Sequence, residues 1–169
     1  MHHEGVVARI CAALAQLDVR VLLLTGEALD PAELTGLPDA VAVRGFVPHL
    51  AVLPRASLLV THAGMGSLMA AFAAGVPTVC LPLGRDQRKN AQRALELGTS
   101  ITLPDDAEVA DIAAAAGQAL ASSAMVTNAR RMQAAVRRHD PGRLAAEVLQ
   151  SVVRAGPSRA TARCTRAGR

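Results

Sequence analysis

The sequence predicts an α/β fold with a doubly wound, Rossmann-like parallel sheet, and three observations support this prediction. Short apolar runs alternate with stretches of helical periodicity along most of the chain, a pattern typical of parallel strands joined by crossover helices on both faces of a sheet. One apolar run, at 56–60, leads through a glycine-rich turn directly into a helix of small residues. The chain has 169 residues, enough for one ordinary domain with its own core.

The first part of the chain begins with a predicted amphipathic helix and continues with three predicted strands. The helix is indicated by apolar residues that recur at helical spacing, namely Val7, Ile10, Cys11, Leu14 and Leu17. The strands are the apolar runs at 19–25, 41–43 and 58–61. A brief helix is expected at 48–55, before the third strand.

The second part continues the alternation and ends in helices. A helix at 66–74 is expected to end at Gly75, which Pro77 follows at a distance typical of a helix C-terminus. Further strands are predicted at 78–81 and 100–103, and a helix that starts at Asp86 should end before Gly98. Three more helices are expected, at 109–120, 123–137 and 142–154.

The order of these elements has one irregularity, because the chain begins with a helix and not with a strand. A doubly wound half normally begins with the strand that becomes the middle of the sheet. We therefore expect this sheet to lack its first, central strand. The strands at 19–25 and 58–61 would then each present an unpaired apolar edge, and we expect poor solubility or self-association.

The net charge of +4 is concentrated at the C-terminus. Residues 155–169 contain four arginines and no acidic residue, and without these four the 18 basic residues fall to 14, against 14 acidic ones. We divide the chain into a folded domain at 1–154 and a basic, disordered tail at 155–169; a phosphate- or membrane-binding arm is the alternative for the tail. Phe46 and Phe72 are the only aromatic residues, too few for a protein that stacks nucleic-acid bases.

The cysteines and the hydropathy pattern point to a reducing compartment. Cys11, Cys80 and Cys164 are widely separated and have no zinc or redox spacing. Cys11 lies on an apolar helix face and Cys80 in a strand, so both are expected to be small buried side chains. No apolar run reaches the roughly 18 residues of a membrane span, and no signal peptide is visible. We expect a cytoplasmic protein.

The glycine-rich turn at 61–67 is the first candidate binding site. Glycine lets a ligand approach the backbone closely, and a helix start offers unpaired N–H groups that suit a phosphate. His62 at the strand end, Gly64, Gly66 and Ser67 could therefore hold a diphosphate. The alternative is an ordinary strand–helix turn in which Ser67 caps the helix.

Two further polar or aromatic pairs follow neighbouring strands. Asp86 and Gln87 stand side by side at a helix start, where a carboxylate and an amide could grip the hydroxyls of a sugar; the alternative is a simple N-cap aspartate. Phe46 follows another strand and could cover a flat base; the alternative is packing in the core. All three groups lie at carboxyl ends of predicted neighbouring strands, so we expect them to meet in one crevice.

The order and spacing of these groups closely resemble the donor-binding motif of UDP-glycosyltransferase-like enzymes, most of all the bacterial antibiotic and macrolide glycosyltransferases of the GT-B fold. The resemblance is specific over about 46–91 and looser over about 6–153. The residues that carry it are Phe46-Val47-Pro48-His49, Leu53-Pro54, Val60-Thr61-His62-Ala63-Gly64-Met65-Gly66-Ser67, Gly75-Val76-Pro77, Leu81-Pro82, Asp86-Gln87 and Asn90-Ala91.

The resemblance implies a role for each candidate residue. Phe46 would stack on the nucleotide base, Val47 would offer its backbone to the base edge, and His49 would approach the ribose. His62, with Gly64, Gly66 and Ser67 beside it, would contact the diphosphate. The pair Asp86 and Gln87 would hold hydroxyls of the transferred sugar. The donor would be a UDP- or dTDP-linked sugar, and the family needs no metal or other cofactor.

Two departures from the family pattern limit what this chain is expected to do alone. Many family members have a glutamate that binds the ribose where this chain has Ala70. The family also has two Rossmann-like domains, and the N-terminal one binds the acceptor and supplies the general base. The chain resembles only the C-terminal, donor-binding half, so we expect no catalytic residue in it.

The resemblance thus implies the donor half of an inverting glycosyltransferase that moves a hexosyl or deoxyhexosyl group from a nucleoside-diphosphate sugar to a small hydroxylated acceptor. The acceptor would be bound by an N-terminal domain or a partner chain. The alternative is a non-catalytic nucleotide-sugar-binding subunit or relic.

Overall fold

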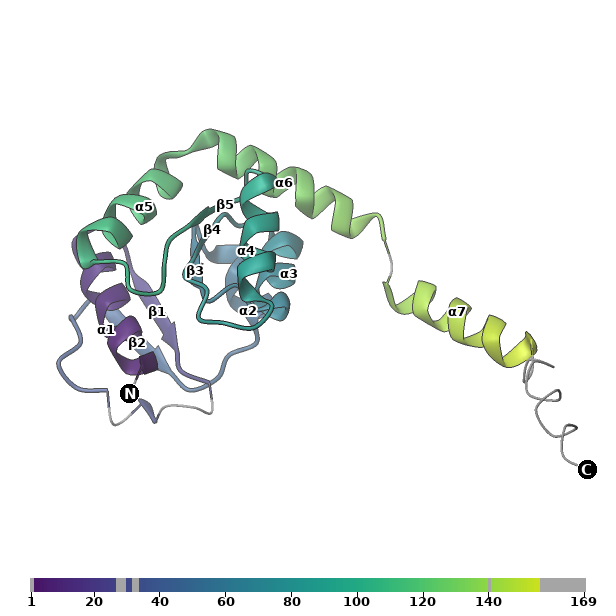
Figure 1. Cartoon of the computed structure of the whole chain (residues 1–169), viewed down its shortest axis with the longest axis horizontal. Coiled ribbons are helices and arrows are strands. Elements are labelled where there is room, and N and C mark those ends of the chain that lie inside the picture. The colour runs from purple at the N-terminus through teal and green to yellow at the C-terminus, as the bar shows by residue number, and fades with distance from the viewer. Residues whose placement is uncertain (1, 27–29, 32–33, 140, 156–169) are drawn as a thin grey trace, which may run out of the picture. The chain divides into compact units, whose positions relative to one another are not determined.

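A computed structural model describes residues 2–26, 30–31, 34–139 and 141–155 (Figure 1). The helices are α1 (His2–Leu14), α2 (His49–Val52), the 3₁₀ turn η2 (Leu53–Arg55), α3 (Met65–Ala74), α4 (Gln87–Glu96), α5 (Val109–Ala121), α6 (Ser123–Arg137) and α7 (Pro141–Ala155). The strands are β1 (Val21–Leu24), β2 (Val41–Arg44), β3 (Leu59–Thr61), β4 (Thr78–Cys80) and β5 (Ser100–Thr102). Each strand and long helix expected from the sequence is present, with ends that differ by a few residues.

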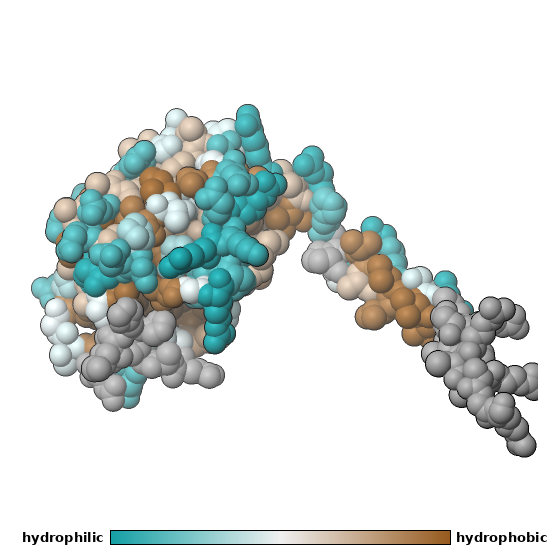
Figure 2. Space-filling view, viewed as in Figure 1, coloured by the Kyte–Doolittle hydropathy of each residue, from teal (hydrophilic) through white to brown (hydrophobic). Residues whose placement is uncertain are grey.

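The chain divides into two compact units, residues 1–134 and 135–169. The first unit holds all the described strands, together with the helices from α1 to α5. The second holds α7, whose apolar side chains gather along one face (Figure 2). The predicted tail lies outside the described residues from position 156 onward, so its disorder stays a prediction, as does a domain boundary at 154.

All the described strands pair in parallel, which confirms the predicted class of fold, but they form two sheets and not one. Strand β1 pairs with β2, in the register Val21 to Val41. The other sheet has the order β3-β4-β5, with Leu59 opposite Thr78 and Thr78 opposite Ser100. In the described part of the chain β1 pairs only with β2 and β3 only with β4. No ladder joins β1 to β3, which is where the sequence predicts a missing central strand.

Helices cover both faces of the β3-β4-β5 sheet. On one face α5 contacts β4 and β5 and also packs against α1. Val79, Leu81 and Ile112 are almost completely buried there, and they belong to the main apolar core. Arg9 of α1 reinforces this layer, because its guanidinium donates to the backbone oxygens of Asp105 (2.7 Å) and Ala107 (3.1 Å).

Small polar side chains alternate with this apolar face along the strands. Thr78, Cys80 and Ser100 are buried, and the Ser100 hydroxyl donates to the Cys80 sulfur at 3.2 Å. Helix α4 packs beside them against β5. Cys11 is also buried, so the expected burial of both thiols is confirmed. Burial raises the pKa of both, and in Cys80 it outweighs the hydrogen bonds with Ser100 and Thr78.

Helix α3 ends as the sequence predicts but begins differently. Gly75 takes the left-handed conformation at its C-terminus, with φ of 73°, and the Gly75 N–H donates to Phe72. At the other end the N-cap residue is Gly64 and no side chain caps the helix. The alternative in which Ser67 caps the helix is therefore wrong, because Ser67 already lies inside its first turn.

Candidate functional site

The candidate residues follow the carboxyl ends of three parallel strands. His62 comes directly after β3, Asp86 follows β4, and Phe46 follows β2. Since β3 and β4 are adjacent and parallel, the loops at 62–64 and 81–86 leave the same edge of one sheet. This edge is where open α/β sheets bind their ligands.

The loop after β3 exposes His62 and holds the next residue in an unusual conformation. Ala63 is completely buried and has φ of 65°, in the left-handed region that residues with a Cβ rarely adopt. Its N–H group donates to the Thr61 hydroxyl at 3.3 Å. Such conformations cost roughly 1–3 kcal/mol and persist where the surrounding structure imposes them, often at binding sites.

Gly64 links this loop to helix α3, and the imidazole explains why no larger residue fits. A Cβ atom on Gly64 would lie 2.5 Å from Nε2 of His62. The backbone of Gly64 is itself ordinary, with φ of −61°. The first N–H groups of α3 have no side-chain cap, so the start of the helix offers backbone donors next to the His62 ring in the chain.

The loop after β4 is built around the side chain of Gln87. Its Oε1 atom accepts hydrogen bonds from the backbone N–H groups of Leu83 (2.8 Å) and Gly84 (3.1 Å). Because two backbone N–H groups point at the same atom of Gln87, that atom must be the amide oxygen. This fixes the orientation of the Gln87 amide. The Nε2 group of Gln87 is thereby turned away from these two backbone groups.

Asp86 occupies the N-cap position of α4 but does not act as a conventional cap. Its carboxylate makes no capping hydrogen bond to the helix backbone. Instead Asp86 Oδ2 accepts a hydrogen bond from Asn90 Nδ2 at 2.9 Å, and the residue is exposed. Arg85, just before it, has φ of 55°, so a second residue with a Cβ takes the left-handed conformation in this site. The simple N-cap alternative is wrong.

Asn90 joins the two loops, a role that the sequence did not predict. Its Nδ2 group donates both to Asp86 Oδ2 and, at 3.2 Å, to the backbone oxygen of Ala63. The structure therefore brings the His62 and Asp86 loops together. The spacing of four residues between Asp86 and Asn90 is the signal that predicts their contact, since such residues face each other on a helix.

The segment after β2 presents its aromatic side chain to solvent. Phe46 is 79% exposed, so the alternative in which it packs in the core is wrong. Val47 and His49 are partly exposed, and His49 begins α2. Helix α2 contacts α3, so this segment is connected to the His62 loop by the packing of two helices.

A match to a protein-family model shows which family this chain belongs to. The family model described as "Erythromycin biosynthesis protein CIII-like, C-terminal domain" matches residues 8–154. The chain belongs to this family. The glycosyltransferase resemblance of its motif is thereby confirmed, and the two tied loops belong to a C-terminal domain of the macrolide and antibiotic glycosyltransferase type.

Curated relatives of this glycosyltransferase domain are themselves glycosyltransferases. Oleandomycin glycosyltransferase from Streptomyces antibioticus is 35% identical over 132 residues, which cover 78% of this chain and 31% of that protein. Demethyllactenocin mycarosyltransferase from Streptomyces fradiae is 34% identical over 150 residues, or 88% of this chain and 32% of that protein. The chain thus spans about a third of the length of the relatives it matches.

Solved structures confirm the fold of the domain. The calicheamicin glycosyltransferase CalG4 matches with a TM-score of 0.81 and 35% identity, over 92% of this chain and 40% of that chain. The glycosyltransferase VinC, solved in complex with DTDP, matches with a TM-score of 0.69 and 27% identity, over 78% of this chain and 33% of that chain. These neighbours are GT-B glycosyltransferases, as the sequence predicts.

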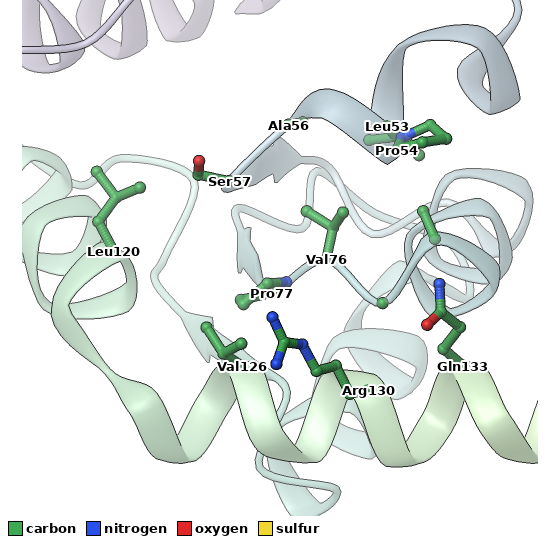
Figure 3. A pocket seen from close by; sticks show the side chains of 12 residues that line it. Leu53, Pro54, Ala56, Ser57, Val76, Pro77, Leu120, Val126, Arg130 and Gln133 are labelled. Carbon is green, nitrogen blue, oxygen red and sulfur yellow. The ribbon is translucent and has the colours of Figure 1, made fainter.

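A cavity of about 400 Å³ lies elsewhere in the domain (Figure 3). It is lined by residues that precede β3 and β4, such as Ser57 and Pro77, and by residues of α6. Figure 3 shows Arg130 extending from α6 toward Pro77. None of the nine candidate residues lines this cavity, which adjoins the amino ends of the strands and not the carboxyl ends where His62 and Asp86 lie.

The described residues contain neither a metal-binding cluster nor a single helix suited to a membrane. Across 2–26, 30–31, 34–139 and 141–155, no group of three His, Cys, Asp or Glu residues is placed to hold a metal ion. No single helix in the same part of the chain is long and apolar enough to cross a membrane; only the bent combination of 109–121 with 123–154 meets that length and composition.

Proposed function

We propose that this chain binds the nucleoside-diphosphate sugar of a glycosyltransferase, which transfers a hexosyl or deoxyhexosyl group to a small hydroxylated acceptor with inversion and without a metal. The observation that carries the proposal is the tie between the two loops. Asn90 holds the loop of His62 and the carboxylate of Asp86 at one edge of the sheet. A nucleotide sugar needs a site for its diphosphate next to a site for its sugar hydroxyls, and the His62 loop and the Asp86 carboxylate are suited to these two uses.

In this proposal each candidate residue handles one part of the donor. The exposed ring of Phe46 covers the base and the backbone of Val47 meets its edge, while His49 approaches the ribose. His62 and the free N–H groups at the start of α3, around Gly64, Gly66 and Ser67, contact the diphosphate. These donors offset the negative charge that grows on the leaving nucleoside diphosphate, which is electrostatic stabilisation of the transition state.

Asp86 and Gln87 hold the sugar from the other loop. The exposed carboxylate of Asp86 accepts from sugar hydroxyls, and the Nε2 group of Gln87 donates to a sugar oxygen. The general base and the acceptor site belong to an N-terminal domain or a partner chain. Transfer therefore requires that second part, whereas donor binding does not.

Isothermal titration calorimetry of the purified chain with UDP- and dTDP-linked hexoses tests the proposal. We expect saturable binding of at least one donor, weakened about tenfold or more by His62→Ala or Asp86→Ala, which each remove a hydrogen bond to a charged group. Arg88→Ala, an exposed change on α4 outside the candidate set, serves as the control. A folded chain that gives no binding signal with any donor would refute the proposal.

The second candidate function is a non-catalytic relic, and Ala70 is the observation that favours it. Ala70 lies on α3 one turn beyond Ser67 and is partly exposed, with no acceptor for ribose hydroxyls. A relic predicts that Ala70→Glu leaves donor affinity unchanged. The donor-binding proposal instead predicts a gain of about ten- to a hundred-fold, since a charge-assisted hydrogen bond contributes roughly 1.5–3 kcal/mol.

Calorimetry of Ala70→Glu beside Met69→Glu separates these outcomes. Met69 is 44% exposed on the same helix, so its substitution adds the same charge at another point of α3. A gain confined to Ala70→Glu supports an intact ribose site. Equal affinities for both variants and the wild type would support the relic.

A further inference from the structure

Asn90 makes two hydrogen bonds from a single nitrogen atom to two different parts of the site. Nδ2 donates to Asp86 Oδ2 at 2.9 Å and to the Ala63 backbone oxygen at 3.2 Å. The second bond joins residues 27 positions apart in the sequence. Asn90 is partly buried on the first turn of α4, next to the completely buried Ala91.

The chemistry of these partners fixes the orientation of the Asn90 amide. Both partners are oxygen atoms that can only accept, so the group that faces them must be the NH₂. Its two N–H bonds match the two acceptors, and neither a carboxylate nor an apolar side chain of the same size could serve both. An asparagine is thus required here by the pair of acceptors and not by the helix.

The two atoms that accept hydrogen bonds from Asn90 both lie beside residues that are proposed to bind the ligand. Ala63 is held in the left-handed conformation between His62 and Gly64, and its oxygen is the atom that Asn90 binds. On the other side, Asn90 occupies Oδ2 of Asp86, which orients the carboxylate and leaves Oδ1 for a ligand. The Asn90 side chain therefore positions both loops by hydrogen bonds.

We propose that Asn90 is a positioning residue that couples the diphosphate loop to the sugar-binding carboxylate, so that the two halves of the donor are bound as one unit. This inference rests on the proposed function. Asn90 itself touches neither half of the donor. It holds His62 through the backbone of Ala63, and it holds Asp86 through its carboxylate.

Calorimetry of the whole chain with a free nucleoside diphosphate and with the corresponding nucleotide sugar tests this coupling. The ratio of the two affinities measures what the sugar adds. Asp86→Ala should bring this ratio close to one, because the sugar then adds no affinity. The affinity for the free diphosphate should stay unchanged. Asn90→Ala should lower the diphosphate affinity about tenfold and also reduce the sugar ratio, because it releases both loops.

The double variant separates coupling from two independent effects. If Asn90 acts on the sugar through Asp86, then adding Asn90→Ala to Asp86→Ala causes no further loss in the sugar ratio, although the diphosphate affinity still falls. A further, additive loss in that ratio would overturn the coupling. The control is Gln92→Ala, which removes an exposed amide of α4 that hydrogen-bonds only with Glu96 among the described residues.

Amide hydrogen exchange gives a readout that does not depend on binding. Asn90→Ala should accelerate exchange at residues 63–64 after β3, far along the sequence from the substitution, while Gln92→Ala should not. If a folded Asn90→Ala variant shows unchanged donor affinity and unchanged exchange, the role of Asn90 is refuted but the proposed function is not. A folded wild-type chain that binds no donor would refute the proposed function and this role with it.

Discussion

At the scale of single residues, the orientation of Gln87 limits which hydrogen bonds the proposed site can make with a sugar. The Oε1 atom is engaged by the N–H groups of Leu83 and Gly84, so the loop after β4 depends on Gln87 as an acceptor. What remains for a ligand is the Nε2 group, which only donates. In the proposed donor site Gln87 therefore requires an acceptor oxygen on the sugar, while the neighbouring Asp86 requires a donor.

Replacing Gln87 with glutamate separates these two uses of the side chain. Gln87→Glu keeps an acceptor for the Leu83 and Gly84 N–H groups but removes the donor and adds a negative charge. We expect the melting temperature to be nearly unchanged and the affinity for the nucleotide sugar to fall about tenfold. Thermal denaturation and calorimetry measure the two effects, with Gln92→Glu as the charge-matched control. A wild-type affinity in Gln87→Glu would contradict a donor role.

The contact between Gly64 and His62 gives a second prediction at this scale. In Gly64→Ala the new Cβ would lie 2.5 Å from Nε2 of His62, so the imidazole must move, while the backbone conformation at Gly64 suits alanine. We therefore expect little change in stability and a loss of about tenfold in affinity for the free nucleoside diphosphate. Gly117→Ala, in α5, has only an ordinary contact with Leu17 and serves as the control. Equal diphosphate affinities in both variants would exclude a role for the His62 ring.

At the scale of elements, helix periodicity and terminator residues predicted the elements well, while contacts between a helix start and a distant loop were not predictable. Gly75 ends α3 and Gly98 follows α4, as their positions indicate, because a left-handed residue after a helix favours glycine. The N-cap alternatives at Ser67 and Asp86 are wrong, although both residue types favour N-caps. Their roles depend on contacts across the fold, such as that between Asn90 and Ala63, and propensity does not encode those.

Gly75 also shows how a helix end depends on a distant residue. The Gln133 side chain donates to the Ala73 backbone oxygen at 3.2 Å, and a Cβ on Gly75 would lie 3.1 Å from its amide carbon. Since Gly75 has φ of 73°, Gly75→Ala adds strain of roughly 1–2 kcal/mol to the crowding. We expect urea unfolding to show a free energy lower by about this amount, with donor affinity unchanged. A stability equal to that of the wild type would show that the helix end relaxes without cost.

At the scale of the whole molecule, the break between the two sheets was predictable from element order alone. Among the described residues α1 comes before every strand, and β1 and β3 share no ladder. The proximity of the Asp86 and His62 loops was also expected, since both follow adjacent parallel strands, but the Asn90 hydrogen bonds that join them were not. Topology rules are enough to locate the break, whereas the site depends on side-chain geometry.

The unpaired strand edges lead to a prediction about association. Backbone N–H and C=O groups on a free edge can pair with another chain, and the exposed apolar face of α7 (Leu144, Val148, Leu149, Val152 and Val153) offers a second route. We expect sedimentation velocity to show concentration-dependent association that persists in Val148→Glu/Val152→Glu, which disrupts only the α7 face.

A strand supplied directly before α1 should suppress association through the sheet edges. A valine-rich segment ending in Gly-Ser, fused ahead of His2, can pair in parallel with β1 and β3 and occupy both free edges. We expect the fusion, in the Val148→Glu/Val152→Glu background, to sediment as a monomer and to melt at a higher temperature. A fusion with lysine and proline in place of the valines should do neither, because proline cannot donate to a ladder. If the unmodified chain is already a monomer with a cooperative thermal transition, the free edges do not drive association.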